Sequence, residues 1–445
     1  FDGPVTPSLL GMPSEMQQEV AVSDAADRPE HIWDYAWANP DDEARMKAAI
    51  QSLKNLNYFE DDVRITPDPT ENPEEANLII DVKEKSTGEF NFGVGISSVD
   101  SVMGNVSLTQ HNFDYSDWPK SLRDFISGNA FVGAGQTFSI QATGGAYRQN
   151  YSTSFMEPWA FDRPIRLGGS IFRTVDNEYQ DFKETNTGLS ATIGKRLWGP
   201  RWDGEVSYRF SYTQIGGTYR YYPPILLDQQ GDKLLSSATP RLVYDGRDSR
   251  LLPSRGFMAT AGVELGGGPF LGSYDWVRPS VDIARYLTIY KLKSGGKHIL
   301  ELRARASMIG QYGNTSEIPP FLRFYDGGID SIRGFQYRTI TPRENGFAIG
   351  GKKEELAGAE YSLPLYEEIV RGSVFYDAGT VWDAGQVDPH TTLSNDSGWR
   401  TSAGLGLSVR TPLSPMPIRI YFSRAIRSNP EDRLKTIDFT FGTRF

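Results

Sequence analysis

The chain has 445 residues, no cysteine and a formal net charge of −10. Disulfides and cysteine metal sites are therefore excluded, and the four histidines are scattered without the spacing of metal ligands. The acidic balance argues against nucleic-acid binding, because phosphate contacts need clustered Lys and Arg. We expect no metal, no cofactor and no nucleic-acid partner.

Aromatic residues and glycine are abundant, with 24 Phe, 22 Tyr, 9 Trp and 45 Gly, although only 38% of the chain is hydrophobic. This combination fits strands that show one face to apolar surroundings and the other to water. No apolar run is long enough for a transmembrane helix. The strands of a membrane barrel alternate apolar and polar residues, so the lack of such a run does not exclude them. The sequence opens at Phe1 without the basic stretch and apolar stretch of an export signal, so no such signal is expected within it.

Residues 1–40 are rich in proline and acids and predict no defined fold. From Asp41 an apolar stripe at helical spacing predicts a helix that ends near Asn57. Strands are expected at 62–66 and 77–82. The prolines between them are expected to interrupt both strands: Pro67, Pro69 and Pro73. We assign residues 1–87 to one N-terminal region.

From Gly88 to Phe445, short segments alternate apolar and polar side chains between clusters of turn residues. In one of them Leu302 and Ala304 alternate with Arg303 and Arg305, so one face is wet. About sixteen such segments are expected, an even number as in single-chain bacterial barrels. The predicted fold is mainly β: an antiparallel transmembrane β-barrel over 88–445, preceded by a small α+β domain.

A soluble β-sandwich or propeller would show the same alternation. The last strand, which runs to Phe445, and the many aromatic residues near strand ends favour the membrane barrel, because such aromatics form interfacial girdles. Between two of the strands, residues 117–126 predict a short amphipathic helix. It either lies in the membrane interface or packs on the barrel rim.

The connection from Gln311 to Gly350 is unusually long for a chain of strands. Its aromatic and aliphatic content argues against disorder, so we expect it to fold back onto the barrel. It contains the stretch Ile332-Arg333-Gly334-Phe335.

Three further stretches accompany this one. The first runs Tyr244-Asp245-Gly246-Arg247-Asp248, then Leu252-Pro253-Ser254-Arg255-Gly256-Phe257; the others carry Glu360 and Asp377. In this order they resemble the C-terminal barrel of the BamA-type outer-membrane assembly family. The helix, strand, turn and strand after Asp41 resemble the second half of a POTRA module, the small periplasmic domain of that family.

The resemblance implies a latch inside the barrel lumen. The loop that carries Arg333, Gly334 and Phe335 would enter the lumen, where Arg333 meets Glu360 and Asp377. A planar guanidinium suits this task, because its fixed donors bind carboxylates in pairs.

The barrel must also pair its first and last strands. These are expected at 89–98, with Gly93 and Gly95, and at 435–445, with Phe439, Phe441 and Phe445. Glycines weaken a strand, so this seam could open and present backbone groups to an incoming strand. The alternative is that both glycines only relieve crowding in the lumen.

The resemblance implies a non-enzymatic insertase that folds β-barrel proteins into the bacterial outer membrane through this lateral seam, with its N-terminal region in the periplasm. The expected partners are unfolded outer-membrane proteins, accessory lipoproteins and the lipid bilayer. The alternative is a two-partner-type transporter that passes a polypeptide through the lumen. An outer-membrane phospholipase is disfavoured, because His298 and His390 have no nucleophile motif beside them.

Overall fold

The computed structural model describes residues 64–69, 76–83, 87–97, 101–121, 123, 130–145, 148–176, 183–216, 222–250, 252–293, 295–367, 369–411 and 414–441. The expected helix at 41–57, residues 122 and 124–126 of the expected helix at 117–126, and Phe445 lie outside the described residues.

Two strands of the N-terminal region form an antiparallel pair, β1 (Arg64–Pro69) and β2 (Ala76–Asp81). The expected interruption at Pro67 and Pro69 is wrong, because β1 continues through both. Within the described residues β1 pairs only with β2. Proline is tolerated on such an edge, where a missing N–H costs no bond of the ladder.

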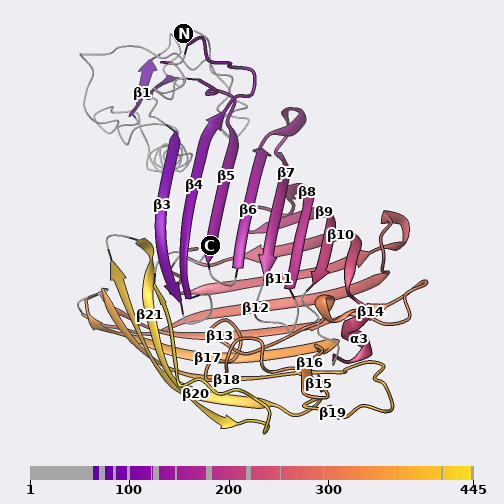
Figure 1. Ribbon diagram of the computed structural model, residues 1–445. Coiled ribbons are helices and arrows are strands. Elements are labelled where there is room, and N and C mark those ends of the chain that lie inside the picture. The colour runs from indigo at the N-terminus through magenta and orange to yellow at the C-terminus, as the bar shows by residue number, and fades with distance from the viewer. Residues whose placement is uncertain are drawn as a thin grey trace. The chain divides into compact units, whose positions relative to one another are not determined.

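The sixteen strands of the described barrel follow the chain order, and each pairs with its neighbours (Figure 1). They are β3 (Gly88–Ser97), β4 (Ser101–Phe113), β5 (Gln136–Gly145), β6 (Arg148–Glu157), β7 (Ile165–Asp176), β8 (Lys183–Arg196), β9 (Trp202–Gly216), β10 (Gly231–Asp245), β11 (Gly256–Gly266), β12 (Trp276–Lys291), β13 (Lys297–Met308), β17 (Lys353–Tyr366), β18 (Val370–Trp382), β20 (Arg400–Thr411), β21 (Ser414–Arg427) and β22 (Ile437–Phe441). β14 (Gly310–Gln311) extends β13. The expected strand number and antiparallel order are confirmed.

The remaining described elements are short. They are the helix α3 (Pro224–Leu227), the 3₁₀ turns η4 (Ala160–Asp162), η5 (Gly268–Phe270) and η6 (Pro320–Leu322), and a small sheet of β15 (Arg343–Glu344), β16 (Phe347–Ala348) and β19 (Leu393–Ser394). Among the described residues, no helix has the length and apolarity to cross a membrane.

The two faces of the barrel strands differ in chemistry. On β8, Leu189 and Ile193 are exposed on the outer face. On the inner face Ser190 bonds Ser170 at 2.8 Å between hydroxyl oxygens, and Thr192 bonds Ser207 at 3.1 Å. Exposed apolar side chains on many strands are costly in water but suit a bilayer. This pattern is that of a transmembrane β-barrel.

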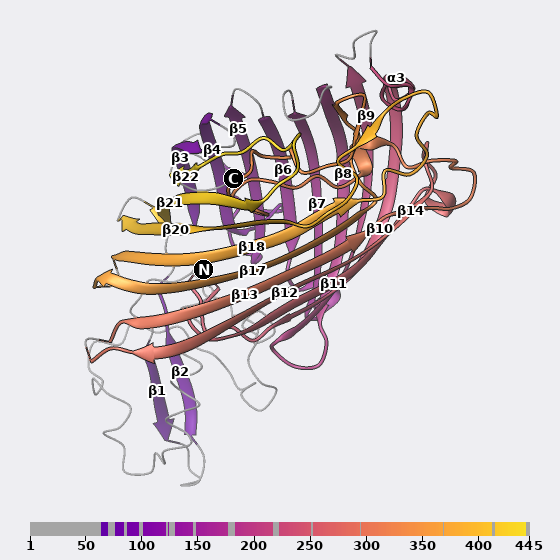
Figure 2. The ribbon, with the colours of Figure 1, turned by 90° about the horizontal axis from the view of Figure 1, so that it is seen from below.

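Because neighbouring strands are antiparallel, the connections alternate between two rims. We call the rim where β3 begins the first rim and the opposite one the second rim. The turns β10–β11, β12–β13, β17–β18 and β20–β21 lie at the first rim, and the long connection between β13 and β17 starts at the second (Figure 2).

The connection at 309–352 is packed against the barrel. Ile332, Phe335 and Ile340 have no exposed surface, and they form a cluster with Leu356 of β17 and Ala425 of β21. The loop therefore folds back onto the barrel wall, as its apolar content predicted.

Candidate functional site

Arg333, on the long loop, binds Asp377 of β18 through both edges of its guanidinium. Nε donates to Oδ2 of Asp377 at 2.7 Å and Nη2 donates to Oδ1 at 2.9 Å. The backbone N–H of Arg333 also donates to Oδ2, at 3.2 Å. Arg333 is 3% exposed and Asp377 is fully buried. Two parallel charge-assisted bonds fix both the position and the angle of the side chain.

Two more charged residues complete this cluster. Nη1 of Arg333 donates to Oε2 of Glu360 on β17 at 2.5 Å. Arg303 of β13 donates to Oδ1 of Asp377 at 2.9 Å and to the carbonyl oxygen of Ser331 at 3.2 Å. Burial opposes the charge of Arg333, but Asp377 outweighs this effect and raises the pKa of Arg333 above its ordinary value. Arg333 is therefore a permanent cation that joins the long loop to β17 and β18.

Aromatic rings enclose the same guanidinium. The Cζ atom of Arg333 lies 3.6 Å from the ring centre of Phe375 and 4.7 Å from that of Tyr421. Cation–π contacts of this kind strengthen when they are shielded from water. Sequence reasoning missed Arg303, Phe375 and Tyr421. Phe375 stands two residues before Asp377 and shares its face of the strand, a signal that could have found it.

The two residues after Arg333 fit a close passage between the loop and the wall. Gly334 has a φ of +88°, and a Cβ there would lie 3.3 Å from the Cβ atoms of Ser402 and Ser423. Phe335 is fully buried and forms a β-bridge with Leu434 of the β21–β22 connection. The structure thus brings together Arg333, Glu360 and Asp377, and we call them the latch.

The motif after β10 builds a turn at the first rim. Arg247 binds both carboxylate oxygens of Asp245 at 2.9 Å. Asp248 accepts from the N–H of Ser254 at 2.8 Å and from the hydroxyl of Ser254 at 2.5 Å. Burial raises the pKa of Asp248, but the bonds from Ser254 and Arg255 outweigh it, and the pKa falls to about 2. The motif therefore closes a loop by capping its own backbone.

A second buried arginine anchors the long loop at the second rim. Arg323 donates to the carbonyl oxygens of Ile318 at 2.8 Å and Ala384 at 2.6 Å, and to Oε1 of Glu317 at 3.2 Å. It ties the loop to the connection between β18 and β20. No sequence pattern pointed to Arg323, because its acceptors are mostly backbone carbonyls.

The seam between β22 and β3 is short within the described residues. The register pairs are Thr440↔Ser97 and Phe441↔Ile96. By contrast, β20 and β21 share ten register pairs. Gly93 and Gly95 lie in β3 and Phe439 in β22, beside this junction.

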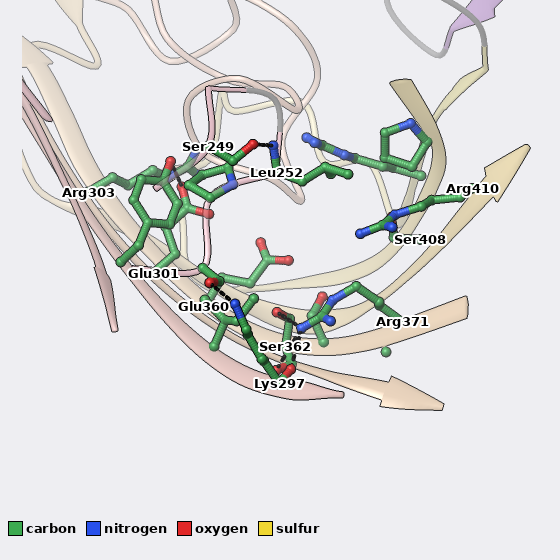
Figure 3. A pocket seen from close by; sticks show the side chains of 18 of the residues that line it. Ser249, Leu252, Lys297, Glu301, Arg303, Glu360, Ser362, Arg371, Ser408 and Arg410 are labelled. Carbon is green, nitrogen blue, oxygen red and sulfur yellow. Dashed lines mark hydrogen bonds between the residues drawn. The ribbon is translucent and has the colours of Figure 1, made fainter. Parts of the chain in front are cut away.

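A cavity of about 710 Å³ lies inside the barrel between the tip of the long loop and the turns of the first rim (Figure 3). Its lining includes eight cations and four carboxylates. The cations are Arg247, Arg250, Lys297, Arg303, Arg333, Arg371, Arg410 and Arg419. The carboxylates are Asp248, Glu301, Asp330 and Glu360. The cavity is therefore basic although the whole chain is acidic.

Residues 130–445 match the model of the Omp85 superfamily domain. The chain belongs to the Omp85 superfamily. The match includes the latch, the cavity and β22, while Gly93 and Gly95 precede it.

Relatives of this Omp85 chain include the outer membrane protein assembly factor BamA of Nitratidesulfovibrio vulgaris, 26% identical over 417 residues, which covers 90% of this chain and 47% of the relative. BamA of Neisseria meningitidis is 23% identical and covers 91% and 53% of the two chains. The human sorting and assembly machinery component 50 homolog is 22% identical over 56% of this chain and 53% of its own length. The Omp85 chain spans about half the length of these relatives.

Solved structures support the fold. BamA from Haemophilus ducreyi lacking POTRA domains 1–3 superposes with a TM-score of 0.72 at 20% identity, over 90% of this Omp85 chain and 78% of that chain. CdiB from Acinetobacter baumannii gives a TM-score of 0.56 at 14% identity, over 88% and 66% of the chains. Both are similar in fold.

Among the described residues no group of three or more His, Cys, Asp or Glu could hold a metal ion. His298 instead bonds a neighbour, with Nδ1 2.7 Å from the hydroxyl oxygen of Tyr361. The site of this Omp85 chain is thus a set of ion pairs, a seam and a basic cavity.

Proposed function

We propose that this chain is the barrel part of an outer-membrane protein assembly factor, which helps unfolded β-barrel proteins to fold and insert. The observation that carries the proposal is that the barrel closes by pairing its last strand, β22, with its first, β3, while the latch fixes the long loop to β17 and β18. Opening of this seam would expose two strand edges, which can template an incoming strand.

The relatives support this assignment, because their names describe assembly factors and sorting and assembly machinery. The names of these sequence relatives favour assembly over the transporter alternative. We place the barrel in the outer membrane with its first rim toward the periplasm, and we divide the chain into a POTRA-like region at 1–87 and the barrel at 88–445. Accessory lipoproteins are proposed partners.

In this proposal the latch is a structural support. Arg333 holds the long loop in the lumen through Asp377 of β18 and Glu360 of β17, and this keeps the loop and these two strands in place while the seam moves. The exposed outer face meets the lipid, and the client approaches from the first rim. The latch has no proposed catalytic role.

Reconstitution in liposomes tests the function. Unfolded outer-membrane barrel protein is added to liposomes with and without this chain, and folding is followed by the heat-modifiable gel mobility of the client. We expect faster folding with the chain present. Equal rates in both samples contradict the proposal, and capture of a secreted partner without faster folding favours the transporter.

A further inference from the structure

The charges of the lumenal cavity are distributed unevenly around its wall. The carboxylates of the lining come from the β10–β11 turn, the long loop, β13 and β17. The wall formed by β18, β20, β21 and β22 contributes Arg371, Arg410 and Arg419 to the lining and no carboxylate. Figure 3 shows Arg371, Ser408 and Arg410 together on one side of the cavity and Glu301 on the other.

This basic wall leads directly to the seam. Arg371 of β18 is the register partner of Ser408, Ser408 is that of Arg419, and Arg419 is that of Thr440. Residues directly opposite each other on paired strands share one face of the sheet. All four line the cavity, and Thr440 is the residue of β22 that pairs with Ser97 of β3. We call this set the arginine row.

The chemistry of the row suits a carboxylate. Nη2 of Arg371 donates to the carbonyl oxygen of Lys297 at 2.8 Å and to the hydroxyl of Ser362 at 3.0 Å, which holds the side chain in place. Arg371 and Arg419 both line the cavity, and a guanidinium attracts carboxylates through its charge and its planar geometry. The hydroxyls of Ser408 and Thr440 add neutral donors between the charges. An acyl chain would find little apolar surface here, because the row consists of charged and hydroxyl side chains.

We propose that the arginine row binds acidic side chains of an unfolded polypeptide and guides that polypeptide along the inner wall to the seam. The inference rests on the proposed assembly function and names the property of the client that this wall recognises. On the opposite side the cations stand among four carboxylates, whereas the wall that carries the arginine row has none, so an acidic segment is directed toward β21 and β22.

Two labelled peptides test the proposal with the whole protein in nanodiscs. Both are short, unfolded and alternate polar with apolar residues; one carries Asp at the polar positions and its twin carries Asn. We expect the Asp peptide to bind roughly tenfold more tightly at low ionic strength, since several partly exposed ion pairs together reach that magnitude. The ratio of the two dissociation constants should move toward one as salt is added, because screening shortens the range of the attraction to about 10 Å at 0.1 M.

Variants then locate the binding. In the double variant Arg371→Gln with Arg419→Gln, the two peptides should bind about equally, so the ratio of their dissociation constants should fall to about one. In Arg250→Gln it should persist, because Arg250 lines the same cavity from the β10–β11 turn and its side chain is 86% exposed. Heat-modifiable mobility of each variant verifies that the barrel is folded. The comparison of the two peptides on the unaltered protein needs no variant.

Three outcomes overturn the proposal: equal binding of the two peptides, an unchanged ratio in the double variant, or displacement of the Asp peptide by inorganic phosphate at equal concentration, which would mark a site for small anions. These results are distinguishable from failure of the proposed function. If liposome reconstitution still accelerates folding while the peptides bind equally, only the arginine row is wrong.

Discussion

Individual side chains explain why the long loop is held at one place on the wall. Asp377 is fully buried and accepts from Arg333 and Arg303, so its two oxygens serve two cations. Glu360 is the outer member, with 21% of its side chain exposed. A buried ion pair costs more to break than a partly exposed one, because the remaining charge loses its partner without regaining water.

Asp377→Ala should therefore destabilise the barrel by on the order of 3–5 kcal/mol. Glu360→Ala should cost less, about 1.5–3 kcal/mol, the range for a hydrogen bond to a charged group. The temperature at which the folded band disappears on semi-native gels measures both. Glu355→Ala is the control, because Glu355 is an exposed carboxylate on the same strand as Glu360. An Asp377 variant as heat-stable as the control would contradict the latch.

Two glycines of the long loop distinguish the need for a left-handed backbone from the need for space beside the latch. Gly334 and Gly346 both have left-handed backbones, with φ of +88° and +82°. A Cβ at Gly334 meets Ser402 and Ser423, whereas one at Gly346 meets nothing within 4 Å. Both alanine variants pay the backbone strain, about 1–2 kcal/mol, and only Gly334→Ala should add a packing cost of about 1–3 kcal/mol. Equal unfolding temperatures for the two variants would show that the close approach of Gly334 to the barrel wall does not contribute to stability.

Asp248 predicts a dependence on acid. Its folded pKa of about 2 lies below the ordinary value of 3.8, so its contribution is complete above about pH 4 and is lost as the pH falls toward 2. With 38% of the side chain exposed, solvent screening limits the effect to about 1 kcal/mol or less. Unfolding midpoints measured from pH 5 down to about 2 should fall more steeply for the wild type than for Asp248→Asn. The same dependence of the unfolding midpoint on pH in both proteins would contradict a stabilising role for the Asp248 carboxylate.

Strands and their pairings decide which part of the barrel can move. β8 and β9 share fourteen register pairs, β21 and β22 share four, and β22 and β3 share two within the described residues. The seam joins the last strand of the barrel to the first, whereas β8 and β9 are consecutive in the chain, and the opening proposed above is at the seam. The latch carboxylates stand on β17 and β18, and β20 and β21 separate these strands from the junction.

A disulfide across the seam tests this difference. Ser97→Cys with Thr440→Cys joins register partners of β3 and β22 in a chain with no other cysteine. We expect oxidation to stop client folding in liposomes and reduction to restore it, because the seam can no longer open. Thr192→Cys with Ser207→Cys joins β8 and β9 on the inner face and serves as the control. Full activity with the seam locked would eliminate the lateral route.

The outer and inner faces of the barrel wall suit different surroundings, lipid outside and water inside. Val374, Leu405 and Phe422 are register partners on three neighbouring strands, and they are 49%, 59% and 52% exposed. The inner face carries hydroxyl pairs and ion pairs instead. A surface of this kind is stable only when lipid covers its outside.

Leu405→Arg should accordingly destabilise the barrel in a bilayer by about 2–4 kcal/mol, the range for a cation on the lipid face near the midplane. Thr192→Arg places the same side chain on the inner face and should cost less. Denaturant titration of both variants in liposomes, followed by tryptophan fluorescence, measures the difference. Equal destabilisation would mean that the outer face is not in contact with lipid.

Local sequence was sufficient for the strands of the barrel, because their period of two is written in neighbouring residues such as Leu302 and Arg303. The same local reasoning was wrong at Pro67 and Pro69, since tolerance of proline depends on whether a second strand lies beside the first. The latch residues came from resemblance to a family. Phe375, Tyr421 and Arg303 were missed, because they meet Arg333 only after distant strands have paired.

The two-faced strands, the antiparallel barrel, the lack of disulfides and the apolar long loop all follow from the order of the amino acids. Three features emerge only from the folded chain: Asp377 is shared by two arginines, Arg323 anchors the long loop at the second rim, and the basic wall of the lumen ends at the seam. These features depend on the register between strands that are far apart in the chain. Register sets which side chains face each other, and no local pattern specifies it.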